Sequence, residues 1–574
     1  MRRFHCAGFA LIMFLARPSS ATAQPAAWNG GNGNWSTPGQ WTPAVVPDGP
    51  TFDVTIAAAG AYTVTLDSMR TANTFTLNNA SATLLVTGGQ LTLNTSATLT
   101  DGIISLSSGT IVGGSINAGA GRIRATSSFN NVLDGVSLGT GVLDLTPSSS
   151  RIRFTNGTNF SNTGTVALGI SSQFYLAETV TTPSGVNFSM ASGSLISADG
   201  FTATLGAASS ATPTISVAAS SNVTIGAGFF NNQPNSVLVN QGQISFAGAN
   251  STLTITTSGT GSGLQNAGII QATAALTTVN VSANSSFSNS GALRAVNGGT
   301  IAIADTAAFS NFNSGALTGG TYEVFAGSVI NLNNRVITTS GPSTTLLLDG
   351  ASSVFTAANT VATNNGSFTI SNGRQHTVAT FTNNGMLTVG TTSGDLAKLS
   401  ANVQVNNGGV LRGTGTVEGS VTVASGGTLA PGASPGILTV IGPVTLTAGA
   451  NFVVDLSGAI AGSGYSQVAL NSGGSANLNN ATLTTTLNYA PSIGDTFTII
   501  TGGTVTGTFA GLPQGATVNL GTFMGTPYTA TIAYNATSVV LTVPEPTCIL
   551  AACSAVGAIV AGIRARRRTA LPPG

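Results

Sequence analysis

The sequence predicts an all-β protein whose body is a right-handed parallel β-solenoid, a fold in which each coil of chain stacks on the next. Short runs alternate between apolar and polar residues, as in Thr300-Ile301-Ala302-Ile303-Ala304, and alternation at period two indicates strands. Turn pairs such as Asn-Gly, Gly-Gly and Ser-Gly separate these runs. In addition, a five-residue pattern recurs along the chain: a Phe or Leu, a spacer, Asn, a spacer and Gly.

The recurring pattern predicts both the coil length and the corners of the coil. Copies begin at Phe160, Leu238, Leu264, Phe287 and Phe381, and Phe309 begins a stretched copy. The copies that begin at 238, 264, 287 and 309 follow one another at a nearly constant interval of about two dozen positions, which is typical of repeat architectures. Weak copies are expected in the longer gaps, one of them at Leu332-Asn333-Asn334. A single Asn-x-Gly would be an ordinary turn, but this spacing favours a solenoid.

Each residue of the pattern has an expected role. The Phe or Leu points inward and stacks on its copy in the next coil. The asparagine sits at a corner, where its amide either bonds to the neighbouring asparagine or supports a left-handed turn. The glycine is expected to supply a positive φ at that corner. The predicted corner asparagines are Asn162, Asn240, Asn266, Asn289 and Asn383.

Residues 1–23 have the organisation of a secretory signal peptide. Arg2 and Arg3 precede an apolar run from Cys6 to Ala16. Ala21 and Ala23 form a small-x-small cleavage site before Gln24. We therefore expect export through the inner membrane.

Residues 24–56 are predicted to cap the first coil. All three tryptophans, Trp28, Trp35 and Trp41, lie here among glycines and prolines. Because an open coil presents unpaired strand edges, a solenoid needs such a cap, and aromatic rings can cover its apolar end. A sugar-stacking platform built from the same rings is the alternative.

The body is predicted to comprise solenoid repeats over 57–436 and a separate β-rich unit over 437–543. The segment from Val405 to Leu438 contains Gly413-Thr414-Gly415 and Pro431-Gly432-Ala433-Ser434-Pro435-Gly436. It resembles a segment near the end of autotransporter passengers, and the tryptophan-rich opening also resembles the start of such proteins. Residues 437–543 are too few for a membrane pore, which is built from many amphipathic strands.

The C-terminus has three parts in a fixed order. Val543 leads into Pro544-Glu545-Pro546, an uncharged apolar run covers 547–563, and a positive cluster follows, made of Arg564, Arg566, Arg567 and Arg568. A helix over 547–563 would span about 25 Å, slightly less than the hydrocarbon layer of a membrane. The arginines are expected to remain in the cytoplasm. The sequence therefore predicts a transmembrane helix after Pro546.

This tripartite tail, over 544–568, resembles the sorting signal of PEP-CTERM proteins. The resemblance implies recognition by exosortase, a membrane protease-transpeptidase, near the Pro-Glu-Pro motif and transfer of the body to the cell surface. It also implies a link to extracellular polysaccharide, which the bacteria of this family produce. A C-terminal anchor that is never processed is the alternative, and it likewise places the body outside the cytoplasm.

Composition excludes several function classes. Residues 24–543 contain ten cationic side chains against fifteen carboxylates, a net charge of −5, which is the wrong sign for a nucleic-acid partner. All cysteines lie in the terminal segments, so the body has no thiolate metal site. His376 has no second ligand near it and is expected to be exposed. No metal or cofactor is expected.

The carboxylates are dispersed singly along the chain, whereas glycosidase or lyase chemistry needs them in pairs or with cationic partners. The preferred hypothesis is therefore a non-enzymatic surface protein of structural or adhesion type, bound to the envelope or to an exopolysaccharide (biofilm) matrix. A polysaccharide-active β-helix lyase or hydrolase is the alternative. A β-aggregating fibre is a third hypothesis, because charge is low and β-propensity high.

Overall fold

The computed structural model describes residues 22–177, 186–206, 213–217, 219–230, 232–246, 248–282, 285–433, 435–471 and 473–545. These residues form β-strands and three short 3-10 helices, η1 (Pro38–Gln40), η2 (Thr140–Val142) and η3 (Thr356–Thr360). The prediction of an all-β solenoid is confirmed at this level, while its handedness stays a prediction. The chain divides into two compact units. Unit 1 is Met1–Ser216 with Val223–Leu238, and unit 2 is Val217–Asn222 with Val239–Gly574.

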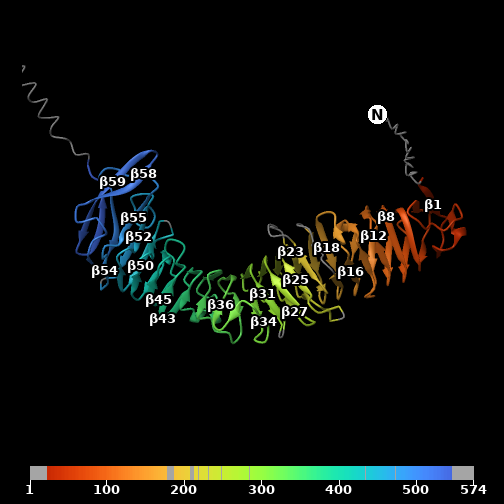
Figure 1. Cartoon of the computed structure of the whole chain (residues 1–574), viewed down its shortest axis with the longest axis horizontal. Coiled ribbons are helices and arrows are strands. Elements are labelled where there is room, and N and C mark those ends of the chain that lie inside the picture. The colour runs from red at the N-terminus through yellow and green to blue at the C-terminus, as the bar shows by residue number, and fades with distance from the viewer. Residues whose placement is uncertain are drawn as a thin grey trace, which may run out of the picture. The chain divides into compact units, whose positions relative to one another are not determined.

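Unit 1 is a stack of coils (Figure 1), and strand pairing places its strands on three faces. Apart from a short antiparallel pairing at its N-terminal end, strands on each face pair in parallel with their counterparts in the next coil. The first face contains β6 (Met69–Leu77), β8 (Gln90–Leu99), β10 (Thr110–Val112), β13 (Val132–Asp134), β16 (Arg151–Thr155), β19 (Gln173–Ala177), β21 (Leu195–Asp199) and β24 (Asn222–Ala227). The second contains β4 (Phe52–Ile56), the later halves of β6 and β8, β11 (Ser115–Ala118), β14 (Ser137–Leu138) and β17 (Asn159–Phe160). The third contains β2 (Gly33–Asn34), β5 (Tyr62–Leu66), β7 (Ala82–Thr87), β9 (Ile103–Ser107), β12 (Arg122–Ala125), β15 (Leu143–Asp144), β18 (Gly164–Leu168) and β20 (Val186–Met190).

Unit 2 repeats this three-faced arrangement. One face contains β26 (Gln243–Phe246), β29 (Ile269–Ala272), β32 (Ala292–Ala295), β37 (Gly320–Val324), β40 (Thr344–Asp349), β42 (Ser367–Ser371), β44 (Met386–Val389), β46 (Val410–Gly413), β49 (Thr428–Pro431), β52 (Asn451–Leu456) and β55 (Thr482–Leu487). The second contains β28 (Gly263–Asn266), β31 (Ser286–Asn289) and β34 (Ala308–Phe309), and further on β36 (Ala316–Leu317), β39 (Thr339–Ser340), β41 (Thr363–Asn364), β43 (Gln375–Asn383), β45 (Lys398–Val405), β48 (Val421–Val423), β51 (Pro443–Leu446), β54 (Ser475–Asn477) and β57 (Thr504–Thr506). The third contains β27 (Thr252–Thr257), β30 (Thr278–Val281), β33 (Thr300–Ile303) and β38 (Val329–Asn331), and further on the early halves of β43 and β45 with β47 (Thr416–Glu418), β50 (Ile437–Ile441), β53 (Gln467–Leu470) and β56 (Thr496–Thr501).

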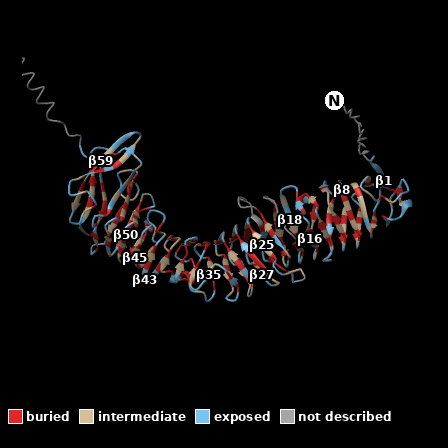
Figure 2. Cartoon of the chain, viewed as in Figure 1, coloured by how far each residue is buried: buried red, intermediate tan, exposed pale blue. Residues whose placement is uncertain are grey.

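The core is the inside of the coils, where alternate strand residues stack. Burial alternates along most strands, as the buried positions in Figure 2 show. In unit 1 the rings of Phe154, Phe160, Phe174 and Phe188 form a continuous column, with centroids of Phe154 and Phe174 4.7 Å apart. The predicted inward role of Phe160 is thus confirmed, as is that of Phe287, which stacks on Phe309 at 5.9 Å.

Coil length varies more than the spacing of the sequence pattern predicts. The coil that joins Lys398 to its partner Thr416 is short, whereas the one that joins Val468 to Ile500 is long. The strands stay in register because the extra residues lie in the corner loops, which can lengthen at little entropic expense.

The first coil is closed at its N-terminal end by the tryptophan segment. β1 (Gln24–Trp28) pairs in parallel with β4 and antiparallel with β3 (Trp41–Thr42). The ring of Trp41 packs on the rings of Trp28 and Trp35. The tryptophan segment thus covers this end of the stack, while β2 and β4, which lie within the predicted range 24–56, already pair as coil strands.

The C-terminal part departs from the predicted division at residue 437. Parallel pairing continues through β50, β53 and β54, and the pairing of β52 with β55 is also parallel. Apart from isolated antiparallel bridges such as the one between Leu456 and Tyr465, antiparallel pairing begins where β58 (Thr517–Phe523), β59 (Thr526–Asn535) and β60 (Ser538–Thr542) close the stack, with β60 against β56. The change from coil to closure thus lies near the start of β58, well beyond position 437. The Pro-Gly turns just before 437 interrupt the sequence pattern, but the coils continue past them.

No helix long and apolar enough to span a membrane is found in the described part of the chain. The run predicted to span the membrane, 547–563, lies outside the described residues.

Candidate functional site

Four of the five predicted corner asparagines form buried columns in unit 2. Asn240, Asn266 and Asn289 are at most 1% exposed. The Asn240 Nδ2 donates to Asn266 Oδ1 at 2.8 Å, and the Asn266 Nδ2 donates to Asn289 Oδ1 at 2.7 Å. Of the two predicted roles, the ladder between neighbouring coils is therefore the one observed.

Each amide in the column also bonds to the main chain. The Asn266 Nδ2 donates a second hydrogen bond to the Ala292 carbonyl at 3.1 Å, and its own backbone carbonyl accepts from Ser290 and Gly291. An amide has both donors and an acceptor, so one residue type can continue the column from coil to coil. Beyond Asn289, Asn311 of the stretched copy takes over, since its Nδ2 donates to the Asn289 carbonyl at 2.7 Å.

A second column contains a residue that sequence reasoning missed. Ser340 Oγ donates to Asn364 Oδ1, and Asn364 Nδ2 donates to Asn383 Oδ1, both at 2.8 Å. Asn364 lies in Thr363-Asn364-Asn365-Gly366, where the expected Phe or Leu is Ala362. The repeated Asn-Asn-Gly, one coil before the copy at Asn383, was the available signal. The predicted weak copy at Leu332-Asn333-Asn334 is not a rung, because Asn334, which holds the asparagine position of the pattern, is exposed and its Nδ2 donates to the Asp305 carboxylate.

The glycine of the pattern acts differently from the prediction. Gly268, Gly291 and Gly385 do not have a positive φ. A Cβ on Gly291 would meet the Gly268 carbonyl oxygen at 1.9 Å, and one on Gly385 would meet the Gly366 carbonyl oxygen at 2.1 Å. The glycine is therefore needed for the close approach of successive backbones. A positive φ does occur at Gly164, of 147°, and at Gly315 of the stretched copy, of 83°.

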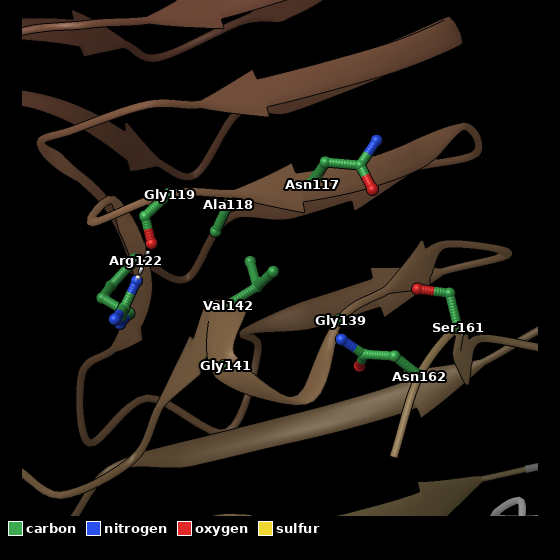
Figure 3. A pocket seen from close by; sticks show the side chains of 9 residues that line it. All are labelled: Asn117, Ala118, Gly119, Arg122, Gly139, Gly141, Val142, Ser161 and Asn162. Atoms are coloured by element: carbon green, nitrogen blue, oxygen red, sulfur yellow. Dashed lines mark hydrogen bonds between the residues drawn. The ribbon is translucent and has the colours of Figure 1, made fainter. Parts of the chain in front are cut away.

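Asn162 is the exception among the predicted corners. It is exposed, and its Oδ1 accepts from the Thr140 backbone N–H at 2.7 Å. It lines a small pocket of about 180 Å³ in unit 1, together with Ser161, Asn117 and Arg122. Figure 3 shows its amide against Gly139, while Arg122 bonds to Gly119 on the other side. The Asn162 side chain therefore supports the η2 turn of the preceding coil and belongs to no asparagine column among the described residues.

The tryptophans pack as a cap and are unavailable as a sugar platform. Trp28, Trp35 and Trp41 are 3%, 0% and 1% exposed. Their rings meet edge to face at 4.9 Å, and each indole N–H donates to a backbone carbonyl. Since stacking on a sugar needs an open ring face, the alternative interpretation is wrong.

His376 is buried, although the sequence predicts an exposed histidine. It is 2% exposed, its Nε2 bonds to the Val361 carbonyl at 2.8 Å, and its ring packs against Phe368 and Phe381. Burial lowers its pKa, so the ring is neutral near pH 7. Among the described residues, no group of three or more His, Cys, Asp or Glu is placed to hold a metal ion.

A row of neutral polar side chains crosses successive coils of unit 2. Its members pair rung by rung on the second face and point outward. The row, called here the polar row, consists of Thr339, Thr363, Thr382, Gln404, Thr422, Thr445, Asn477 and Thr506. At about 4.8 Å per strand, the row extends over about 34 Å. Hydroxyl and amide groups at a fixed spacing can both donate and accept hydrogen bonds.

Unit 1 contains a buried carboxylate in an aromatic cluster. Asp199 is 2% exposed, and its Oδ1 accepts from the Phe230 N–H at 3.0 Å, whereas within the described residues its Oδ2 has no partner. Phe230 packs on Tyr175, and the Arg153 guanidinium lies 4.1 Å from the Phe230 ring centre. Burial raises the pKa of Asp199 to about 6.

Other carboxylates have cationic or backbone partners. Asp144 pairs with Arg124 at 2.8 Å, Glu418 with Lys398 at 2.8 Å and Glu323 with Arg294 at 3.2 Å. Burial acts to raise the pKa of Asp395, but hydrogen bonds from backbone N–H groups on either side of it together lower that pKa. These contacts are structural in kind.

The residues of the two predicted sorting sites lie at the edges of the described chain. Gln24 is the first residue of β1, and its N–H donates to the Thr51 carbonyl at 2.8 Å, while Ala23 before it is exposed. Val543 is 7% exposed and is the last residue of the described chain that backbone hydrogen bonds hold, through Asp495 and Gly494; Pro544 and Glu545 are exposed. Outside the described residues lie Ala21, Pro546, Arg564, Arg566, Arg567 and Arg568.

No model of a known protein family matches the chain, and no curated protein does either. Among solved structures, the crystal structure of the Hap adhesin of Haemophilus influenzae is similar at 13% identity, with a TM-score of 0.22. The match covers 86% of this chain and 64% of that chain, so this chain spans less than two thirds of that protein's length. The fold of this chain is shown by its strand pairing.

Proposed function

We propose that the chain is an exported repeat protein of structural or adhesion type, displayed at the cell surface or in an exopolysaccharide matrix. The observation that carries this proposal is the polar row, a neutral and regularly spaced hydrogen-bonding surface in unit 2. Thr363 and Thr382 in the row have hydroxyls without a hydrogen-bond partner in the described part of the chain. They are therefore available to a ligand.

Regular spacing suits a repetitive partner. A polysaccharide offers hydroxyl groups at repeated intervals, and many weak contacts along one chain add up to useful avidity. Each single contact contributes little, because it replaces a hydrogen bond to water. A surface of this kind favours adhesion or matrix structure over tight recognition of a small ligand.

The proposal also includes export and sorting of the chain by its two terminal segments. The signal peptide over 1–23 would direct export, the helix over 547–563 would hold the chain in the inner membrane, and exosortase would act near Pro544-Glu545-Pro546. In support, β1 begins at Gln24, and the last backbone hydrogen bonds of the described chain are at Val543. Both proposed cuts therefore lie just outside the folded body.

The polar row is tested by adhesion to a surface coated with the producing organism's own exopolysaccharide. The full-length triple variant Thr363→Glu, Thr382→Glu, Thr422→Glu adds three negative charges to the row and should reduce retention about tenfold, through repulsion of acidic chains and lost hydroxyls. The matched control is Thr83→Glu with Thr63→Glu and Thr65→Glu on the third face of unit 1. Equal retention of both triple variants and the wild type would rule the row out.

Sorting is tested by deletion of 544–574. The truncated chain should leave the cell surface and appear in the medium or the periplasm. Replacing the four tail arginines by glutamine, at unchanged length, should have a similar effect through the loss of the stop signal. Unchanged surface display of the truncated chain would contradict the sorting proposal while leaving the adhesion test in place.

The alternative, a polysaccharide lyase or hydrolase, would require two or three carboxylates in one groove. The described carboxylates lend that alternative no support. Asp144, Glu323 and Glu418 pair with cations, and Asp395 bonds to backbone groups. We propose no enzymatic step.

A further inference from the structure

A pocket in unit 2 combines a cation, a carboxylate and hydroxyls on one outward face. Its volume is about 250 Å³, and it is lined by Thr388, Thr391, Arg412, Ala430, Pro431, Gly432, Ala433 and Asp455. These residues belong to the successive strands β44, β46, β49 and β52 and to the corner loops that follow β44 and β49. The pocket includes part of the Pro-Gly segment noted in the sequence. That segment does not belong to the polar row.

Strand pairing explains why the face is hollow at this point. β49 pairs with β52 only through Thr428 with Asn451 and Leu429 with Phe452. Beyond these residues the chain turns out at Gly432, whose φ of 97° and close contact with Gly436 leave no room for a side chain. Ala430 occupies the rung beside Arg412 with a single methyl group. The space next to the guanidinium is therefore not filled by the protein.

The guanidinium is held in position and keeps donors to spare. Arg412 Nε donates to Thr388 Oγ1 at 3.1 Å, and Thr388 itself is 5% exposed. Within the described residues, the two terminal nitrogens of Arg412 have no hydrogen-bond partner. An arginine fixed at Nε presents its terminal N–H groups in the geometry that binds a carboxylate.

The loop that forms one wall is also fixed. Asp395 accepts from the Thr391 N–H at 2.9 Å and from the Ala397 N–H at 2.9 Å, and Thr414 Oγ1 donates to the Thr392 carbonyl at 2.6 Å. Backbone bonds between Gly413, at the end of β46, and Gly432 fix the start of the loop that follows β49. The pocket is thus preformed, which reduces the entropy lost on binding.

We propose that this pocket binds one acidic sugar residue, a hexuronic acid within a polysaccharide chain. Arg412 binds the sugar carboxylate, and the Thr391 hydroxyl takes a sugar hydroxyl. The carboxylate of Asp455 opposes a second anionic group, so that a phosphate or a dicarboxylate is disfavoured. A volume below the roughly 300 Å³ of small drug sites fits about one ring. This inference rests on the proposed function and names the partner more closely.

The test compares binding of two oligosaccharides of equal length, oligogalacturonate and the neutral oligogalactose, to the full-length chain by titration calorimetry. The wild type is expected to prefer oligogalacturonate. Arg412→Gln should weaken oligogalacturonate binding about tenfold and leave oligogalactose binding unchanged, because only the charged contact is lost. Arg412→Lys should restore part of the affinity.

The matched control is Arg122→Gln in unit 1, where Arg122 Nη1 already bonds to the carbonyls of Gly119 and Gly121. This variant should bind both sugars as the wild type does, and thermal unfolding of all variants checks that they fold. Equal affinity of the wild type for both sugars, or an unaffected Arg412→Gln variant, would overturn the pocket assignment. So would displacement of the sugar by millimolar glycine, since a zwitterion would then be the better ligand. Retained adhesion in such a result would leave the proposed function standing, whereas a wild type that binds neither sugar and does not adhere would refute both.

Discussion

The two units bury polar side chains in different ways. In unit 2, Asn240, Asn266 and Asn289 pass hydrogen bonds from coil to coil through their side-chain amides. In unit 1, Asp199 is equally buried, but its carboxylate can only accept, and one oxygen has no partner in the described chain. A repeated neutral amide can extend indefinitely along a stack, whereas a buried carboxylate ends any such column and is stabilised only by local donors.

The two units also differ in what positions the buried polar group: repeated coils in unit 2 and a single loop in unit 1. The asparagine column needs close backbones, and the glycine two positions later provides them. Asp199 instead depends on Phe230, which reaches it from a loop well separated along the chain. Three variants test this contrast, beginning with the largest expected effect.

Asn266→Asp should break the column. A carboxylate there cannot donate to Asn289 Oδ1 or to the Ala292 carbonyl, and it would be charged in the core. We expect a loss of about 3–5 kcal/mol in the free energy of unfolding at pH 7. Urea denaturation of the full-length chain, followed by circular dichroism, measures it. The control is Asn162→Asp, where the exposed side chain can still accept from Thr140 and the change should stay within about 0.5 kcal/mol. Equal midpoints for the two variants would contradict the role assigned to the column.

Gly291→Ala tests the close approach of the coils. Its Cβ would meet the Gly268 carbonyl oxygen, so the two backbones must separate, at an expected loss of about 2–3 kcal/mol. Gly141→Ala is the matched control, because nothing lies within 4 Å of its Cβ position and its φ is not positive. The midpoint of thermal unfolding distinguishes them. If Gly291→Ala melts with the control, the glycine serves no packing purpose.

Asp199→Asn should stabilise unit 1 at neutral pH. The raised pKa, about 6 against the usual 3.8, means that between about pH 4 and pH 6 the folded chain binds a proton that the unfolded chain has released. The free energy of unfolding therefore falls as pH rises through this window. Asparagine removes the buried charge, and a gain of about 1–2 kcal/mol is expected at pH 7, with little change at pH 4. Urea denaturation at both pH values measures it; a variant less stable at pH 7 than the wild type would show that the charge is needed.

The coil architecture was predictable because its cause is repeated in the sequence. Phe160, Phe287 and the asparagines recur with the inward residue, the amide and the glycine in fixed order, so one interpretation accounts for many positions. Asn364 was not predicted as a corner asparagine, because Ala362 occupies the position where the pattern has Phe or Leu. The coil needs only an apolar side chain there.

Contacts between distant segments were not predictable in this way. The positive φ expected of the glycine is wrong at Gly268, Gly291 and Gly385, because local sequence cannot show how near the next backbone comes. His376 lies among polar neighbours, and only its inward position on β43 places it against Phe368. Asp199 looked like one of several single carboxylates, since the loop that covers it is distant in sequence. The Arg412 pocket likewise depends on where β49 and β52 part.

The backbone hydrogen bonds of the described body end at Val543, which has a consequence for the proposed cleavage. Val543 exchanges backbone hydrogen bonds with Asp495 and Gly494, and the prolines and glutamate that follow lie in solvent or beyond the described residues. The proposed scission near Pro544-Glu545-Pro546 would remove the hydrophobic tail without opening any strand pairing of the closing sheet. The body would be as stable after the proposed release from the membrane as before it. Release would therefore change the location of the body without starting its degradation.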